Sequence, residues 1–186
     1  MTSIDVDAVH QEALATYAKV FEASGIRTEL CLPSEVLPLH SLVVQLDGMD
    51  LNDSPLTLRM TFVPLDFGPS SQTEAQVWIL QSYIHLAADI SAERLGQVSA
   101  LVAHVSPHLA IGSFGLLLGS RTLFYKHNMI LPGSPTATHN VRMVDLQCGM
   151  MHQSLKIFNE HFESVLVDGQ DAVSLISKPP LSHLPN

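Results

Sequence analysis

A long amphipathic pattern near the C-terminus is the feature that most constrains how this chain can fold. Apolar residues recur there at alternating spacings of three and four, and an α-helix turns once per about 3.6 residues, so they share one helical face. These residues include no nucleophile paired with a general base and no cluster of metal ligands. We therefore expect a helix that packs on a sheet. The residues on this face are Val141, Val144, Cys148, Met151, Leu155, Phe158, Phe162 and Val165.

The rest of the chain predicts two more helices and six strands. Asp7 is the expected N-cap of the first helix, Gly25 its stop, and Pro107 ends the second helix. A two-residue turn at Gly119 and Ser120, with a positive φ at Gly119, joins the last two strands. The predicted helices cover 8–24, 92–106 and 139–167, with a short turn at 171–176, and the strands cover 27–32, 39–46, 56–64, 75–86 and two segments within 109–131.

This order, α-β-β-β-β-α-β-β-α, predicts an α+β fold with a mainly antiparallel sheet and two or three helices. Residues 1–176 form a single expected domain, and 177–186 (KPPLSHLPN with the preceding Ser) form a flexible proline-rich tail. Loops are expected at 66–73 and at 47–55, DGMDLNDSP. The acidic residues of Asp47–Asp53 offer oxygen ligands for calcium, although their spacing differs from a helix-loop-helix calcium loop. An ordinary solvated loop is the preferred interpretation, and cation binding stays open.

Composition and charge narrow the functional classes. The 186 residues are 46% hydrophobic and 15% charged, which is typical of a folded globular protein. Apolar runs stay shorter than the roughly 18 residues of a membrane span, and the start MTSIDVDAVH does not resemble a signal peptide, so we expect a cytoplasmic protein. The two cysteines, Cys31 and Cys148, are expected to be reduced. The net charge of −9 excludes nucleic acid and anionic membranes as partners and favours a basic or amphipathic protein.

Three segments together resemble a known family. They are ISAERLGQVSALVAHVS, the strand pair within GSFGLLLGSRTLFYKHNMIL, and the long amphipathic helix that follows. This chain is similar to the type III secretion chaperone-like fold and to its YbjN-like group. The resemblance implies a non-enzymatic binding protein that pairs into a homodimer and holds an unfolded segment of a client. The extra length, the acidic loop and the proline tail depart from small secretion chaperones, so the resemblance does not extend to secretion.

Patterns that would signal catalysis or a cofactor are incomplete. His104 and His108 are four apart, but Pro107 is expected to break the helix between them, and no third ligand lies nearby in sequence. Glycines 112, 115 and 119 do not lead into a helix as a phosphate loop requires, and Ser113 lacks the spacing of a nucleophile elbow. We therefore expect no metal, no cofactor and no enzymatic activity.

The leading hypothesis is a protein-binding module with a chaperone-like or adaptor role, which buries a partner segment on a sheet or helix surface. On the strand 123–129, Phe124 and Lys126 are expected to face outward, and with Trp78 and Arg121 they are the candidate contact residues. One alternative is a small-molecule sensor or enzyme with a pocket between sheet and helices, using Tyr83, Arg121 or His127. Another is a structural subunit of a larger assembly.

Overall fold

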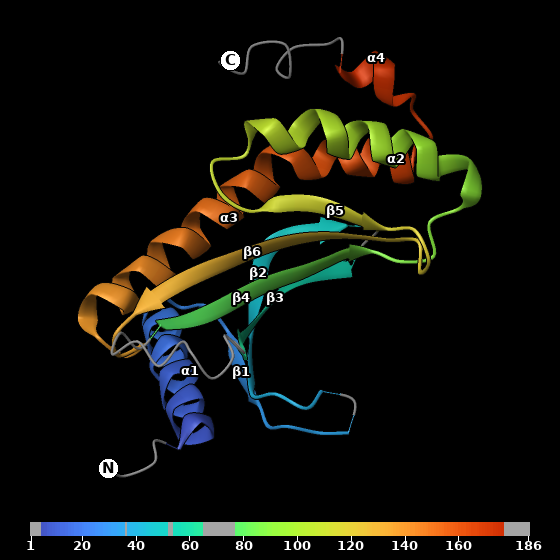
Figure 1. Cartoon of the computed structure of the whole chain (residues 1–186). Helices are drawn as coiled ribbons and strands as arrows, with labels where there is room; N and C mark the ends of the chain where they lie inside the picture. Colours follow the sequence, from blue (N-terminus) through green and yellow to red (C-terminus); the bar gives the residue numbers. More distant parts are fainter. Residues whose placement is uncertain (1–4, 36, 52–53, 65–76, 177–186) are drawn as a thin grey trace. The chain divides into compact units, whose positions relative to one another are not determined.

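The computed structural model describes residues 5–35, 37–51, 54–64 and 77–176, and confirms the α+β class and the predicted order of elements. Six strands form one antiparallel sheet in the order β1-β2-β3-β4-β6-β5 (Figure 1). Among the described residues the helices are four, the last being the short turn expected at 171–176. The elements are α1 (Val6–Ala23), β1 (Thr28–Cys31), β2 (Ser41–Leu51), β3 (Ser54–Val63), β4 (Val77–Ala87), α2 (Ala92–Val105), the 3₁₀ turn η1 (Ser106–His108), β5 (Ser113–Leu117), β6 (Thr122–Pro132), α3 (Thr138–Leu166) and α4 (Ala172–Ile176).

Two compact units make up the chain, and each is described by itself. The division runs through β2, β3, β4, β6 and α3 rather than between elements. The expectation of a single domain over 1–176 therefore stays a prediction. The first unit comprises residues 1–45, 57–83 and 128–148, and the second unit comprises 46–56, 84–127 and 149–186.

In the first unit, α1 begins two residues earlier than predicted. Asp5, not Asp7, is the N-cap, and its carboxylate accepts a hydrogen bond from the Ala8 backbone N–H at 3.2 Å. Asp7 instead lies in the first turn, where a negative charge is favourable beside the positive end of the helix dipole. Gly25 follows the helix with φ +80° and is the predicted stop.

The core of the first unit forms between α1 and alternate residues of the strands. Leu58, Met60 and Phe62 of β3 are buried while their neighbours are more exposed, which confirms the predicted alternation. From α1, the His10 ring stacks on Phe62 with ring centroids 4.6 Å apart. The other buried side chains of α1 are Ala13, Leu14, Tyr17, Ala18 and Phe21.

The acidic loop expected at 47–55 is largely strand. β2 continues to Leu51 and β3 begins at Ser54. Pairing between neighbouring strands thus outweighs the low strand propensity of aspartate and glycine. Residues 52 and 53 and the side chains of 47–51 lie outside the described residues, and so does the calcium hypothesis that depends on them. The expected loop at 66–73 and the tail at 177–186 lie outside them as well.

In the second unit, α2 lies beside the second half of α3, where Arg94 donates a hydrogen bond to the Val165 carbonyl (Figure 1). The predicted apolar face of α3 is confirmed along this half, where five of its residues are buried: Met151, Leu155, Phe158, Phe162 and Val165. Phe114 of β5 packs edge-on against Phe158, with ring centroids 6.1 Å apart. In the first unit, Val144 of the same face is buried, whereas Val141 and Cys148 are half-buried.

The turn between β5 and β6 differs from the prediction. β5 ends at Leu117 and β6 begins at Thr122, so the connection has the four residues 118–121 instead of two. The positive φ falls on Arg121, at +49°, and not on Gly119. A longer loop moves the left-handed position to its last residue, which lies directly before β6.

Candidate functional site

The β5–β6 hairpin presents two of the four predicted contact residues on one face. Gly115 pairs with Phe124 and Ser113 pairs with Lys126 in its antiparallel register. Phe114 and Tyr125, which alternate with these positions, are buried against each other with ring centroids 5.0 Å apart. Phe124 and Lys126 are half-buried on the opposite face, as the sequence predicts.

The Phe124 ring occupies the space above Gly115. A Cβ atom built on Gly115 would collide with the far end of this ring. Since Gly115 has no side chain, the ring lies across β5 and covers its backbone with apolar surface. The glycine in this strand therefore marks a close side-chain approach, and not a phosphate loop.

Arg121 lies at the tip of the same hairpin beside Asp89. Its guanidinium is 3.8 Å from the Asp89 carboxylate, and its carbonyl accepts a hydrogen bond from the Ile90 N–H at 3.1 Å. Asp89 also has a left-handed backbone, with φ +51°. The Asp89 side chain is 89% exposed and the Arg121 side chain 43%, so solvent screens the ion pair and part of Arg121 is accessible to a partner.

The two edges of the sheet have opposite chemistry. Natural edge strands are protected against unwanted pairing by shortness, charge or proline. At one edge, β1 has four residues with Glu29 among them, and Pro33 follows shortly after. At the other edge, β5 reads SFGLL without charge or proline, and Leu117 and Leu118 are 50% and 70% exposed. The β5 edge is also short and α2 contacts it, but it lacks the charge and the proline of the β1 edge.

Trp78 belongs to the first unit and not to the hairpin surface. Its ring packs edge-on against His10, with centroids 5.2 Å apart. Its Nε1–H donates a hydrogen bond to the Gly133 carbonyl at 2.8 Å. The structure thus gives Trp78 a role in holding the core and the connection between β6 and α3, whereas its predicted role in partner binding stays a prediction.

Two further side chains hold this connection. Tyr17 donates from its hydroxyl to the Pro135 carbonyl at 2.8 Å, and burial raises the pKa of that hydroxyl, which stays protonated. Asn140 donates from Nδ2 to the carbonyls of Pro132 and Ser134 at 2.9 and 2.7 Å. We call these three side chains, Tyr17, Trp78 and Asn140, the clasp. The sequence did not predict the clasp. Asn140 is polar and lies off the apolar face of α3, so nothing in the pattern indicated that it is buried.

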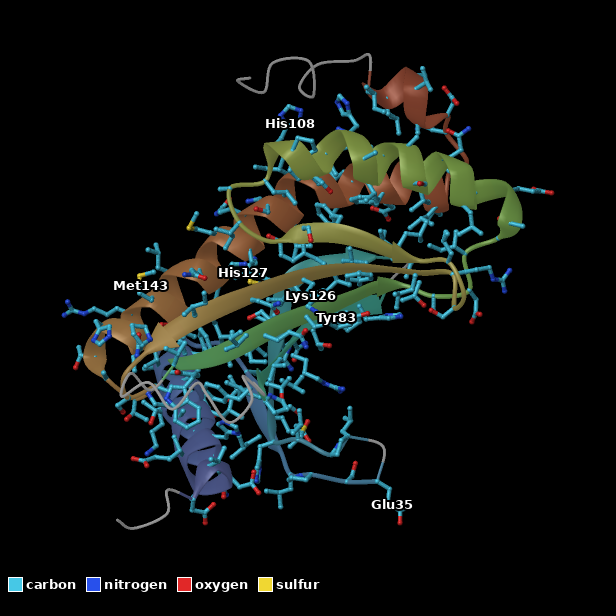
Figure 2. The ribbon with its side chains drawn as sticks, viewed as in Figure 1. Glu35, Tyr83, His108, Lys126, His127 and Met143 are labelled. Atoms are coloured by element: carbon cyan, nitrogen blue, oxygen red, sulfur yellow. The ribbon has the colours of Figure 1, made fainter. Side chains whose placement is uncertain are left out.

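A second surface lies on the outward side of α3 in the first unit. It is a hollow with a volume of about 690 Å³. Figure 2 shows Met143 on α3. Met143 and Leu146 are apolar yet 43% and 58% exposed. We call this surface the α3 hollow; its described lining consists of Thr138, His139, Arg142, Met143 and Leu146.

Charge along the sequence is segregated more strongly than the net value indicates. From Arg94 through Val144 the chain has no aspartate or glutamate, although the whole chain carries −9. Arg121, Lys126 and Arg142 all fall within this stretch. Asp89, from outside this stretch, lies 3.8 Å from Arg121 and offsets its charge, whereas the described lining of the α3 hollow includes Arg142 and no acidic residue.

The histidines and cysteines are the candidate metal ligands and nucleophiles of the sequence. His104 and His108 lie closer than expected, with ring centroids 5.6 Å apart, because η1 continues the helix past Pro107 as a 3₁₀ turn. In the part of the chain that the structure describes, however, no three His, Cys, Asp or Glu side chains form a group that could hold a metal. Both cysteines are free, and burial followed by the charge of Asp145 raises the pKa of the Cys148 thiol, which disfavours a reactive thiolate.

The residues proposed for a small-molecule pocket do not converge within either unit. Tyr83 belongs to the first unit, and Arg121 and His127 belong to the second. Arg121 lies in the hairpin loop, whereas His127 lies on β6, next to Lys126 but on the other face of the strand (Figure 2). Arg121 and His127 therefore do not share a site within the second unit, and the alternative that includes Tyr83 stays a prediction.

Comparisons of the chain with protein-family models, with curated proteins and with solved structures find no match. Of the helices in the described ranges, none has the length and apolar character that crossing a membrane requires.

Proposed function

We propose that this protein is a non-enzymatic protein-binding module that holds an extended segment of a partner in a chaperone-like or adaptor role. One observation carries the proposal: β5 is an edge strand without charge or proline that ends in the exposed Leu117 and is followed by the exposed Leu118. Free cysteines are compatible with a reducing compartment, and we place this activity in the cytoplasm.

The proposed mechanism is strand addition at the β5 edge. Unpaired N–H and C=O groups of an edge strand form backbone hydrogen bonds with an extended segment, whatever its sequence. Each such bond contributes a net of about 0.5–1.5 kcal/mol, so several are needed for useful affinity. Apolar side chains of the segment would contact Leu117 and the Phe124 ring, which adds affinity for unfolded apolar stretches.

Local charge favours acidic flanks in the partner. The net charge alone indicates a basic partner, but the charged residues of the hairpin itself are Arg121, which pairs with Asp89 at 3.8 Å, and Lys126, which is not in that ion pair. Surface charges act mainly over about one Debye length, about 8 Å at physiological salt, so nearby residues matter more than the net value. We therefore expect binding of segments with aspartate or glutamate beside their apolar residues, and weaker binding at high salt.

In the absence of a client, the same edge would pair with a second copy and give a homodimer. Two β5 strands can pair antiparallel around a two-fold axis, and this arrangement brings no charged β5 side chains together. A dimer by size-exclusion chromatography with light scattering is the expected state. The double variant Leu117→Lys, Leu118→Lys should shift it toward monomer.

Client holding can be tested with α-lactalbumin, which aggregates and scatters light when it is reduced. This protein should suppress that light scattering. The double variant Leu117→Lys, Leu118→Lys should lose most of this suppression, because lysines at an edge oppose strand addition. Leu32→Lys is the matched control, since Leu32 is equally exposed and follows the other edge strand. Equal suppression by the double variant and the control, with unchanged melting temperatures, would overturn the proposal.

A further inference from the structure

The α3 hollow combines residues at helical spacing on the side of α3 away from its core. His139, Arg142, Met143 and Leu146 follow the spacing i, i+3, i+4, i+7, so they share a face. Val144, on the core face, is buried. The helix thus has a second organised face that its packing in the first unit does not use.

The shape of the α3 hollow favours a macromolecule over a small ligand. Its volume of about 690 Å³ lies within the range of small-ligand pockets, but its described lining comes from one helix only. Small-ligand sites bury most of the ligand's surface, whereas Met143 and Leu146 are 43% and 58% exposed and so form an open surface. A row of side chains from another protein can pack against such an open helix face.

The charge of the α3 hollow favours carboxylates. Arg142 and His139 lie beside the two apolar residues, and none of the described lining residues is acidic. The hollow also begins at Thr138, the first residue of α3, where the helix dipole adds positive potential. Asp145 is three residues from Arg142 on the same helix but is not among the lining residues.

The clasp fixes the position of this face before a partner arrives. Asn140 lies in the first turn of α3 and holds the preceding carbonyls, while Tyr17 and Trp78 hold the same connection from α1 and β4. A surface that is already ordered loses less conformational entropy on binding. The α3 hollow is therefore preorganised for binding a partner.

Backbone chemistry distinguishes a helical partner from an extended one. The hollow lies on a helix, whose backbone hydrogen bonds are made internally, so it offers no free edge to an extended chain. A helix satisfies its own backbone and presents one apolar row. We propose that the α3 hollow docks an amphipathic helix of another protein, with its apolar row on Met143 and Leu146 and its carboxylates on Arg142 and His139.

The probe for this proposal is a fluorescein-labelled helical peptide with leucines at i, i+3, i+4 and i+7 and glutamates beside them. A second peptide replaces each glutamate with lysine. Fluorescence anisotropy should show that Arg142→Glu weakens the glutamate peptide at least about tenfold, and that the lysine peptide binds the parent protein more weakly by a similar factor. Lys19→Glu is the matched control, because it makes the same charge change on the exposed side of α1 in the same unit.

Three results would overturn this proposal. The first is equal binding of the two peptides, and the second is an equal effect of Arg142→Glu and Lys19→Glu. The third is self-association that Arg142→Glu abolishes in the absence of peptide, which would assign the hollow to a second copy. The variant Leu117→Lys, Leu118→Lys should still bind the glutamate peptide, so failure at β5 and failure at the α3 hollow give different results.

Discussion

The side-chain nitrogen of Asn140 lies 2.7 Å from the carbonyl oxygen of Ser134, six residues earlier in the chain. Asn140 is only 1% exposed, and removal of its amide takes away two part-buried hydrogen bonds to the carbonyls of Pro132 and Ser134. We expect Asn140→Ala to lower the free energy of unfolding by about 1–3 kcal/mol, because two part-buried hydrogen bonds are lost. Urea denaturation measures the effect, and the exposed Asn128→Ala is the control. Equal free energies of unfolding for the two variants would show that the hydrogen bonds of Asn140 do not stabilise the fold.

Gly115 should tolerate a side chain only if Phe124 moves. Gly115→Ala places a methyl group where the Phe124 ring lies, and we expect a loss of about 1–2 kcal/mol, within the usual range for overpacking. Phe124→Ala should remove most of this loss in a double-mutant cycle. Gly119→Ala serves as a control, since a Cβ there meets nothing within 4 Å. Additive losses from Gly115→Ala and Phe124→Ala would contradict the contact.

Substitution of Phe158 should lower the stability of the protein and should lower partner binding only as a consequence of that loss. It is buried against Phe114, and Phe158→Ala should cost about 3–5 kcal/mol, as large-to-small core changes do. The neighbouring Ile157 is exposed, so Ile157→Ala should stay within about 0.5 kcal/mol of the parent. A thermal melt beside a client pull-down below the melting temperature compares the two effects. Lost binding with an unchanged melt would place Phe158 in the interface.

Acid should destabilise the first unit through His10. Burial lowers the pKa of His10 below its ordinary value of 6.5, the charge of His40 lowers it further, and Asp7 opposes both. The folded state therefore favours neutral His10, and this stabilisation is fully present above pH 6.5 and is lost as pH falls through the folded-state pKa.

The variant His10→Phe keeps a ring against Phe62 but does not titrate. From about pH 7 to about pH 5, its free energy of unfolding should fall less than that of the parent protein. Parallel pH profiles for His10→Phe and the parent would show that His10 does not contribute.

Sequence periodicity predicted those parts of the fold whose signal is local. The burial of Leu58, Met60 and Phe62 and of the α3 core face follows from spacing alone. The strand at 47–51 was missed because its residues are typical of turns, and what holds them in β2 is pairing with another strand. The prediction of a two-residue turn between β5 and β6 was wrong for a related reason. The length of this loop depends on where the pairing of the two strands ends, at Leu117 and Thr122.

The candidate site was predictable in part. Alternation along β6 correctly placed Phe124 and Lys126 on one face. The environment of Trp78 depends on His10, Phe62 and Gly133, which lie far from it in sequence. The positive character of the α3 hollow was hidden because net charge averages over the whole chain, whereas a partner contacts one surface.

All hydrogen bonds of the clasp end on main-chain carbonyls between Pro132 and Pro135. Every residue type provides a carbonyl, so most side chains in this segment could be exchanged without loss of the contacts. Gly133 is the exception, because its φ of +69° suits glycine. An inserted or deleted residue, in contrast, would move each carbonyl away from its donor. The connection between β6 and α3 thus tolerates a change of composition but not of length, which makes it a poor place to graft a loop.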